Sequence, residues 1–203
     1  MNGASMNPNP KTILEMSGRA WANARLSDSV LLIIDAQREY VDGALVLDGI
    51  EEALAEGGTL LARARAAKTP VVHVLQRGGP GLFDPQGSGF LPAEPLVPQA
   101  GEAIVEKTFA NAFAGTTLHD ILHATGRTQL IVIGFMTHNC VYATVSTAVT
   151  QGYTCTVVAA ATATRALPDG RGGIIPATVL QEAGLVGMSD TLAKIVHRQD
   201  EIF

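Results

Sequence analysis

The sequence contains few charged residues. Of its 203 residues, 14 are Lys or Arg and 19 are Asp or Glu, together 16% of the chain, where an average soluble chain has roughly 25%. Small residues take up the difference, because 21 positions are Gly and 29 are Ala. Disorder requires high net charge and few apolar residues, whereas this chain carries a net charge of -5 and is 47% hydrophobic. One folded domain with a well-filled core is therefore expected.

Further absences exclude two classes of partner, nucleic acids and membranes, and bear on the compartment. The basic residues are scattered, so no positive patch is expected to bind nucleic acid. The longest apolar runs, such as Val30–Ile34 and Val157–Ala161, are far shorter than the about 20 residues of a membrane-spanning helix, so no membrane partner is expected. Cys140 and Cys155 are the only cysteines, and the first residues, MNGASMNPNPK, lack the apolar segment of a secretory signal. These features favour a cytoplasmic protein.

The chain divides into an N-terminal arm and one domain. Residues 1–27 are expected to form the arm, partly flexible, with a short helix at 17–26, and residues 28–203 to form the domain. Apolar runs predict buried strands, and apolar residues at helical spacing predict helices between them. The strands are expected at 30–34, 70–75, 129–134, 153–159 and 192–196, and the helices at 50–67, 140–151 and from 176 onward. This alternation predicts a three-layer α/β/α sandwich with a mostly parallel sheet.

Reactive side chains follow three of the apolar runs. Asp35 closes the first run, Lys107 follows residues 103–106, and Cys140 comes six residues after Gly134. Ligands of open parallel sheets bind at the carboxyl ends of the strands, so these residues are candidates for one site. Each also has an ordinary explanation: a turn residue, a solvated lysine, a small core cysteine. Together they could cleave an amide, since a carboxylate can take the thiol proton while an ammonium and a helix N-terminus stabilise the thiolate.

Four segments of the sequence carry a family resemblance. They read LLIIDAQREYVDG (31–43), EKTFANAFAGTTL (106–118), IVIGFMTHNCVYATVSTAVTQGY (131–153) and TVVAAATATR (156–165). In this order, over about residues 28–198, they resemble the isochorismatase-like cysteine hydrolases. Within this family they resemble the amidohydrolase branch, which includes N-carbamoylsarcosine amidase and the maleamate and ureidoacrylate amidohydrolases. The resemblance implies the isochorismatase-like hydrolase fold and a homodimer or homotetramer.

The resemblance also implies roles for residues. Asp35 would shuttle the proton, Lys107 would be the positioning cation, and Cys140 would be the nucleophile. A cis peptide bond is implied between Phe135 and Met136, and the backbone N–H groups of Met136 and Cys140 would form an oxyanion hole. Isochorismatase proper lacks the cysteine, and the metal-binding nicotinamidases carry an Asp-x-His sequence that is absent here, so we expect an amidohydrolase with no metal and no cofactor.

Further residues are candidates for substrate binding. They are Gln37, Tyr40, Arg77, Phe109, Asn111 and Phe135. Arg77 opens a Gly- and Pro-rich loop at 77–101, and its guanidinium could bind a substrate carboxylate. His138 lies two residues before Cys140, but residues so close on a tight turn rarely reach each other, so we expect it to face away from the thiol.

The function expected from these residues is hydrolysis of a small amide or carbamoyl compound through a thioester, with release of ammonia or an amine. Two alternatives stay open. One is hydrolysis of a vinyl ether of the isochorismatase type by Asp35 alone, and the other is a catalytically silent protein that binds a small molecule. The low charge of the chain is interpreted partly as the doubly covered sheet and partly as a subunit interface.

Overall fold

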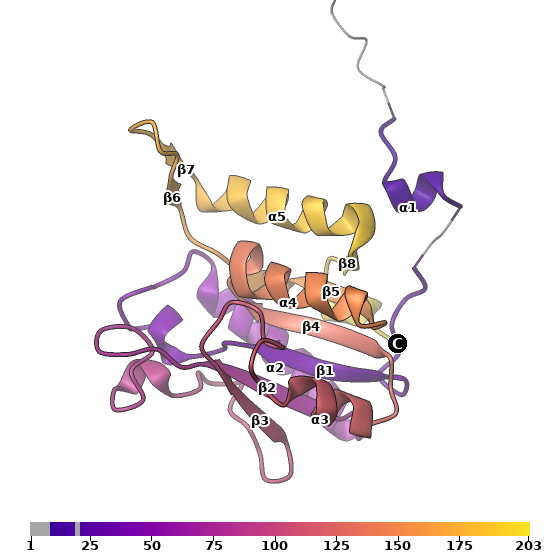
Figure 1. The fold of residues 1–203 in the computed structure, drawn as a ribbon, viewed down its shortest axis with the longest axis horizontal. Helices are drawn as coiled ribbons and strands as arrows, with labels where there is room; N and C mark the ends of the chain where they lie inside the picture. The colour runs from indigo at the N-terminus through magenta and orange to yellow at the C-terminus, as the bar shows by residue number, and fades with distance from the viewer. Residues whose placement is uncertain (1–8, 19–20) are drawn as a thin grey trace, which may run out of the picture.

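A six-stranded parallel sheet forms the centre of the molecule (Figure 1). The structure is a computed structural model that describes residues 9–18 and 21–203. The strand order is β3-β2-β1-β4-β5-β8, and all neighbouring pairs are parallel. The strands are β1 (Ser29–Ile34), β2 (Val71–Gln76), β3 (Ala103–Lys107), β4 (Gln129–Phe135), β5 (Thr154–Ala163) and β8 (Ala193–Val196). The predicted parallel sheet is therefore confirmed.

Helices cover both faces of this sheet. Helix α2 (Ile50–Ala66) packs on one face, whereas α3 (Leu118–Ala124), α4 (Tyr142–Thr150) and α5 (Ala177–Thr191) lie over the other (Figure 1). Among the described residues, no helix combines the length and apolarity needed to cross a membrane. The structure confirms the predicted three-layer α/β/α sandwich.

Strand β1 supplies side chains to both layers of the core. Leu31 and Ile33 belong to the apolar cluster that contains Leu54 of α2, whereas Leu32 belongs to the cluster that contains Val145 of α4. All six residues of β1 are buried. The uninterrupted apolar run in the sequence is thus explained, because successive side chains of a strand point to opposite faces and here both faces are covered.

The N-terminal segment differs from its prediction. The helix expected at 17–26 is absent among the described residues of that range; instead α1 spans Ile13–Met16. Thr12 begins α1 with a capping box, in which its side chain accepts from the backbone N–H of Glu15. Residues 1–8 of the expected arm lie outside the described residues. Leu26, at the end of the arm, is buried and donates its N–H to the carbonyl of Phe203 at 2.6 Å.

A small hairpin that was not predicted precedes α5. Its strands are β6 (Leu167–Pro168) and β7 (Ile174–Ile175), which pair antiparallel and project away from the central sheet (Figure 1). Asp169 organises the turn between them, because its carboxylate accepts the N–H groups of Arg171 and Gly173. Two residues per strand are too few to give a period-2 pattern, although the turn residues that follow Pro168 are typical.

The connections reverse direction between β1 and β4, which are neighbours in the sheet although two strands separate them in the sequence. Such a switch point leaves a crevice at the carboxyl ends of its strands. Gly134, near the end of β4, allows the two strands to approach closely, since a Cβ there would lie 2.0 Å from the carbonyl oxygen of Ile34. Asp35 follows β1 and Cys140 follows β4, so both lie at this crevice.

Candidate active site

Asp35, Lys107 and Cys140 meet at the switch point. Lys107 Nζ lies 2.8 Å from Asp35 Oδ2 and 3.3 Å from Cys140 Sγ. The three residues are 0%, 1% and 5% exposed, respectively. Three residues chosen from separate strand ends therefore form one buried cluster that joins a base, a cation and a thiol.

Two turns position the carboxylate and the thiol. Asp35 has a left-handed backbone (φ 50°), and its N–H donates to the carbonyl of Val74 at 2.8 Å. Cys140 lies in a π-helical turn, Thr137–Val141, which leads directly into α4. The peptide bond between Phe135 and Met136, just before this turn, is cis, as the resemblance implied.

Burial controls the protonation of the site. It raises the pKa of the Asp35 carboxyl above its ordinary value, against the effect of the Lys107 ammonium. Burial, followed by the negative charge of Asp35, raises the pKa of the Cys140 thiol to about 12, again against Lys107. The expected stabilisation of the thiolate by its neighbours is therefore outweighed in the resting site, and the thiol is protonated at neutral pH.

Gln76 completes the surroundings of the lysine. Its Oε1 accepts a hydrogen bond from Lys107 Nζ at 2.5 Å. An ammonium has three donors and no acceptor, and Lys107 contacts Asp35, Cys140 and Gln76. Gln76 was not among the residues predicted for the site, although it is the last residue of β2, at the same edge of the sheet as Asp35.

Gln37 is structural in this arrangement rather than exposed to the pocket. Its side chain is fully buried, and its Oε1 accepts the N–H of Gln76 at 2.7 Å. Its Nε2 donates to the carbonyls of Gln76 and Phe90 at 3.0 and 2.9 Å. The residue predicted to touch substrate instead fastens the end of β2 to the long loop.

A pocket of about 230 Å³ opens beside the thiol. Its lining combines apolar walls with two amide side chains and the cysteine: Tyr40, Leu45, Gln76, Phe83, Ala110, Met136, Asn139 and Cys140. This volume suits a small molecule. Both residues proposed for the oxyanion hole, Met136 and Cys140, line it.

The other predicted substrate-binding residues are placed differently. Tyr40 lines the pocket, and Phe135 is buried behind it, with ring centroids 5.9 Å apart. Phe109 is 64% exposed and does not line the pocket. Asn111 accepts the N–H of Phe113 at 3.0 Å, so its amide shapes the local turn. Of these four residues, only Tyr40 lines the pocket.

Arg77, the arginine predicted to bind a substrate carboxylate, is already paired, whereas Arg165 has no ion-pair partner among the described residues. Arg77, the predicted carboxylate ligand, pairs with Glu106 at 3.2 Å and lies over the ring of Phe90. Arg165 was not considered, but its buried Nε has no hydrogen-bond partner among the described residues. Its positive charge lowers the pKa of Tyr40, whose burial nevertheless raises that pKa. Arg165 does not line the pocket itself, but its charge acts on Tyr40, which does. It forms no ion pair with the described residues, so its guanidinium is a candidate anion-binding group.

The histidines do not join the thiol. His138 Nδ1 lies 2.6 Å from Thr164 Oγ1, and burial lowers its pKa. His73, on β2, contacts Glu102 at 2.9 Å, and Arg65 binds the same carboxylate through two nitrogens. Among residues 9–18 and 21–203, no three His, Cys, Asp or Glu side chains are grouped as metal ligands would be.

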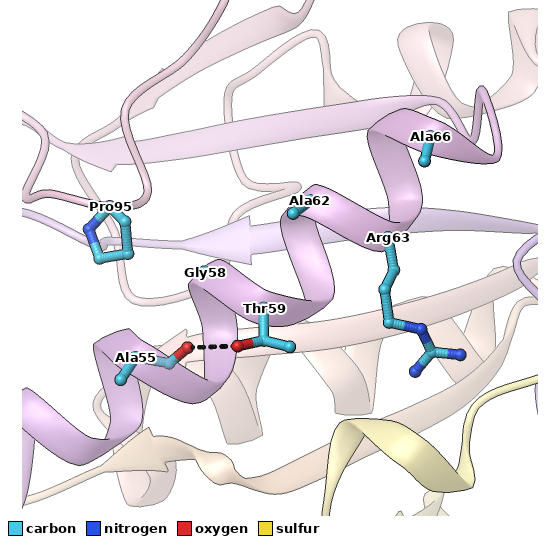
Figure 2. Close-up of a pocket in the computed structure, with 7 residues that line it drawn as sticks. All are labelled: Ala55, Gly58, Thr59, Ala62, Arg63, Ala66 and Pro95. Carbon is cyan, nitrogen blue, oxygen red and sulfur yellow. Dashed lines mark hydrogen bonds between the residues drawn. The ribbon is translucent and has the colours of Figure 1, made fainter.

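A larger hollow lies elsewhere, on the outer side of α2 (Figure 2). It has a volume of about 670 Å³ and is lined by Ala55, Gly58, Thr59, Ala62, Arg63, Ala66 and Pro95. Its polar side chains are already bonded: Thr59 donates to the carbonyl of Ala55, and Arg63 donates to the carbonyl of Ile202. It therefore offers no reactive group, and the smaller pocket beside Cys140 is the candidate active site.

A parallel α/β sandwich with a small pocket and a thiol at its switch point defines the class as an α/β enzyme that acts on small molecules. The family profile described as the isochorismatase domain matches residues 29–197. The chain belongs to the isochorismatase family and is a hydrolase of that family.

Similar proteins extend over most of the chain. The secreted isochorismatase effector Isc1 of Verticillium dahliae is 34% identical, over 91% of this chain and 96% of its own length. Streptothricin hydrolase of Streptomyces noursei is 34% identical, over 82% and 68%. Maleamate amidohydrolase of Pseudomonas putida is 33% identical, over 63% and 68%. The crystal structure of an isochorismatase from Pseudomonas putida superposes with a TM-score of 0.92 at 40% identity, over 96% of this chain and all of that one.

Proposed function

We propose that this hydrolase cleaves a small amide or carbamoyl C–N bond through a thioester on Cys140. The observation that carries the proposal is the contact of one ammonium, Lys107 Nζ, with both Asp35 at 2.8 Å and Cys140 at 3.3 Å beside a small pocket. Two of the similar proteins are named as a streptothricin hydrolase and a maleamate amidohydrolase, which supports an amide as the substrate.

In the first half of the reaction, the thiol proton of Cys140 passes to Asp35 as Sγ attacks the carbonyl carbon. Lys107 stabilises the developing thiolate. The backbone N–H groups of Met136 and Cys140 receive the oxyanion, a contribution worth about 3 kcal/mol in other enzymes. The intermediate collapses when the C–N bond breaks and Asp35 returns the proton to the departing nitrogen, so that ammonia or an amine leaves.

In the second half, water replaces the amine. Asp35 takes a proton from the water as its oxygen attacks the thioester carbon. The C–S bond then breaks, the acid product leaves, and the proton on Asp35 returns to Cys140 Sγ. The raised pKa of Asp35 fits this work, because a carboxylate with a higher pKa is a stronger base toward the proton of the thiol or of water. These steps use side chains of the protein and water, with no cofactor.

Arg165 narrows the substrate class to amides that also bear an anionic group, such as a carboxylate. Its buried, unpartnered Nε leaves a donor available, and a bidentate contact with a carboxylate would satisfy it. The pocket volume of about 230 Å³ limits the rest of the molecule to a few heavy atoms beyond the amide.

A screen for ammonia release tests the proposal. The substrates are maleamate, carbamoyl amino acids, ureidoacrylate, nicotinamide and simple aliphatic amides. We expect release from a small anionic amide, and we expect alkylation of Cys140 to abolish it. A protein that hydrolyses a vinyl ether and stays active after alkylation, or one that binds these compounds without turnover, would overturn the proposal.

We also propose that the protein is a homo-oligomer and that α5 forms its interface. Val179 and Val186, on this helix, are 52% and 62% exposed, and the helix has no Lys or Arg. Beside it lies a hollow of about 640 Å³ whose lining includes Leu185 and Ile195. The charged side chains of α5 are Glu182 and Asp190 alone. A helix with so much exposed apolar surface is normally covered, and a second copy of the chain would present the same surface.

For the compartment, we propose the cytoplasm. Cys140 and Cys155 are both free, and the mechanism needs Cys140 in its reduced form, which a reducing compartment maintains. Localisation of the tagged protein by fractionation tests this, and recovery of the active protein from the culture medium would contradict it.

A further inference from the structure

Glu39 is a buried carboxylate that the proposed mechanism does not use. It is 4% exposed, and no ion pair neutralises it within the described residues. Burying a carboxylate without a cation is costly unless hydrogen bonds compensate for the lost water. Its contacts therefore indicate what the residue does.

The carboxylate of Glu39 joins two loops. Oε1 accepts the N–H of Ala44 at 2.7 Å, and Oε2 accepts the N–H of Phe83 at 3.3 Å. The backbone carbonyl of Glu39 also accepts the N–H of Leu45 at 3.2 Å. These contacts hold residues 44–45 and the loop that begins after β2 against the segment that follows Asp35.

The residues held in this way are walls of the active-site pocket. Tyr40 directly follows Glu39, and both Leu45 and Phe83 are anchored to Glu39; all three line the pocket beside Cys140. The rings of Phe83 and Tyr40 meet edge to face, with centroids 5.2 Å apart. Phe83 has a left-handed backbone (φ 51°), which is costly for an aromatic residue and needs such support.

Two glycines, one in each of these segments, leave space for the carboxylate of Glu39. A Cβ at Gly89 would lie 2.2 Å from Glu39 Oε2, and one at Gly43 would lie 2.9 Å from Oε1. Both glycines thus lie against the carboxyl oxygens. By contrast, a Cβ at Gly79, in the same loop as Gly89, would meet nothing within 4 Å.

We infer that Glu39 is a positioning residue that fixes the apolar wall of the pocket and so sets the size of the substrate. This inference rests on the proposed function, because it takes the pocket beside Cys140 as the substrate site. Glu39 touches no reacting atom. Its carboxylate acts through Ala44, which precedes Leu45, and through Phe83. Leu45 and Phe83 would move apart if the carboxylate released the N–H of Ala44 or of Phe83.

The test compares alkylation of Cys140 by a small reagent, iodoacetamide, and a bulky one, N-phenylmaleimide, with peptide mapping to separate Cys140 from Cys155. Glu39→Gln removes one acceptor oxygen, and Gly89→Ala displaces the intact carboxylate. The measured quantity is the ratio of the alkylation rate with the bulky reagent to the rate with the small one. We expect each variant to raise this ratio about tenfold, the change expected for loss of a hydrogen bond to a charged group.

Two matched variants serve as controls. Glu51→Gln removes an exposed carboxylate from α2, and Gly79→Ala adds a methyl group in open space. Both should keep the wild-type ratio of the two rates. An unchanged ratio in folded Glu39→Gln and Gly89→Ala would overturn the inference, and so would loss of the fold in both, which would make Glu39 a residue needed only for folding.

The ratio separates this inference from the proposed function, because alkylation does not require amide hydrolysis. If the wild-type protein releases no ammonia but the ratio shifts as expected, the proposed function fails and the role of Glu39 in shaping the pocket stands. If ammonia is released, the variants should raise KM for the small substrate and leave kcat nearly unchanged. A residue that only stabilises the fold would leave both the ratio and KM unchanged.

Discussion

Lys107 Nζ lies 3.3 Å from Cys140 Sγ, yet the pKa of the thiol is raised to about 12. Burial is the main cause, and the carboxylate of Asp35 adds to it. The cation beside the sulfur therefore does not create a standing thiolate. In the proposed mechanism, it lowers the cost of forming a thiolate at the moment when Asp35 takes the proton, so the nucleophile would form only when substrate is present.

This pKa predicts the pH dependence of alkylation. The rate at Cys140 should rise about tenfold per pH unit from pH 7 to 10 without a plateau, whereas an ordinary thiol with a pKa of about 8.5 levels off above that pH. Lys107→Met removes the group that opposes the rise in pKa, so it should slow alkylation at every pH in this range. A plateau below pH 9 in the wild-type protein would contradict the burial argument.

Arg165 should determine affinity for anionic substrates. Arg165→Met is expected to raise KM for a carboxylate-bearing amide by about 10- to 100-fold, because the substrate would lose a charge-assisted hydrogen bond. KM for a neutral amide of similar size should stay the same, and Arg165→Lys should recover part of the loss. Arg77→Met is the control, because Arg77 is paired with Glu106. Equal effects of the two Met variants would count against the assignment.

The part-buried ion pair between Arg65 and Glu102 lies outside the pocket, so we expect it to contribute to stability rather than to the reaction. Hydrogen bonds from Arg65 are the main cause that lowers the pKa of Glu102 from 4.5 to about 2. Because the pKa is lower in the folded state, this stabilisation is present above about pH 4.5 and is lost as the pH falls toward 2. Glu102→Gln should cost about 3 kcal/mol at pH 7 and almost nothing at pH 2.

Urea unfolding at the two pH values measures this difference. Glu51→Gln, which removes an exposed carboxylate, should leave the free energy of unfolding nearly unchanged at both. If Glu102→Gln were equally destabilising at pH 2 and pH 7, the ion pair would not be the source of the stability.

Oligomerisation through α5 is tested by sedimentation velocity. The wild-type protein should sediment as a dimer or tetramer, and Val186→Glu should shift it toward the monomer, because the change places charge in the middle of an apolar face. Asp120→Asn, an exposed change on α3, is the control. A wild-type monomer, or an oligomer that Val186→Glu does not weaken, would contradict this interface.

The sequence predicted the sheet and the meeting of the three candidate residues because both follow from short-range patterns. Strand β1 is an uninterrupted apolar run, and Asp35 stands where that run ends. The same rule placed Lys107 at the end of β3 and Cys140 after β4, and parallel strands end at the same edge. The short helix near the N-terminus was misplaced because its capping box at Thr12 and Glu15 was not considered.

The surroundings of the site could not be predicted in this way. The roles of Gln76 and Glu39 come from hydrogen bonds to Lys107 and Phe83, which lie 31 and 44 residues away in the sequence. Gln37 was assigned to the pocket because it follows Asp35, but the direction of its side chain depends on where β2 and the long loop lie. The neutralisation of Arg77 by Glu106 likewise required the pairing of β2 with β3.

In the proposed reaction, Cys140 attacks the substrate with Asp35 as the base. Ammonia release from the substrate found in the screen, measured for four proteins, tests it most directly. Wild-type protein and Cys155→Ala, whose thiol is buried away from the pocket, should keep similar rates. Cys140→Ala and Asp35→Ala should lose at least about 10³-fold in kcat while remaining folded. Retention of ammonia release by folded Cys140→Ala would contradict the account.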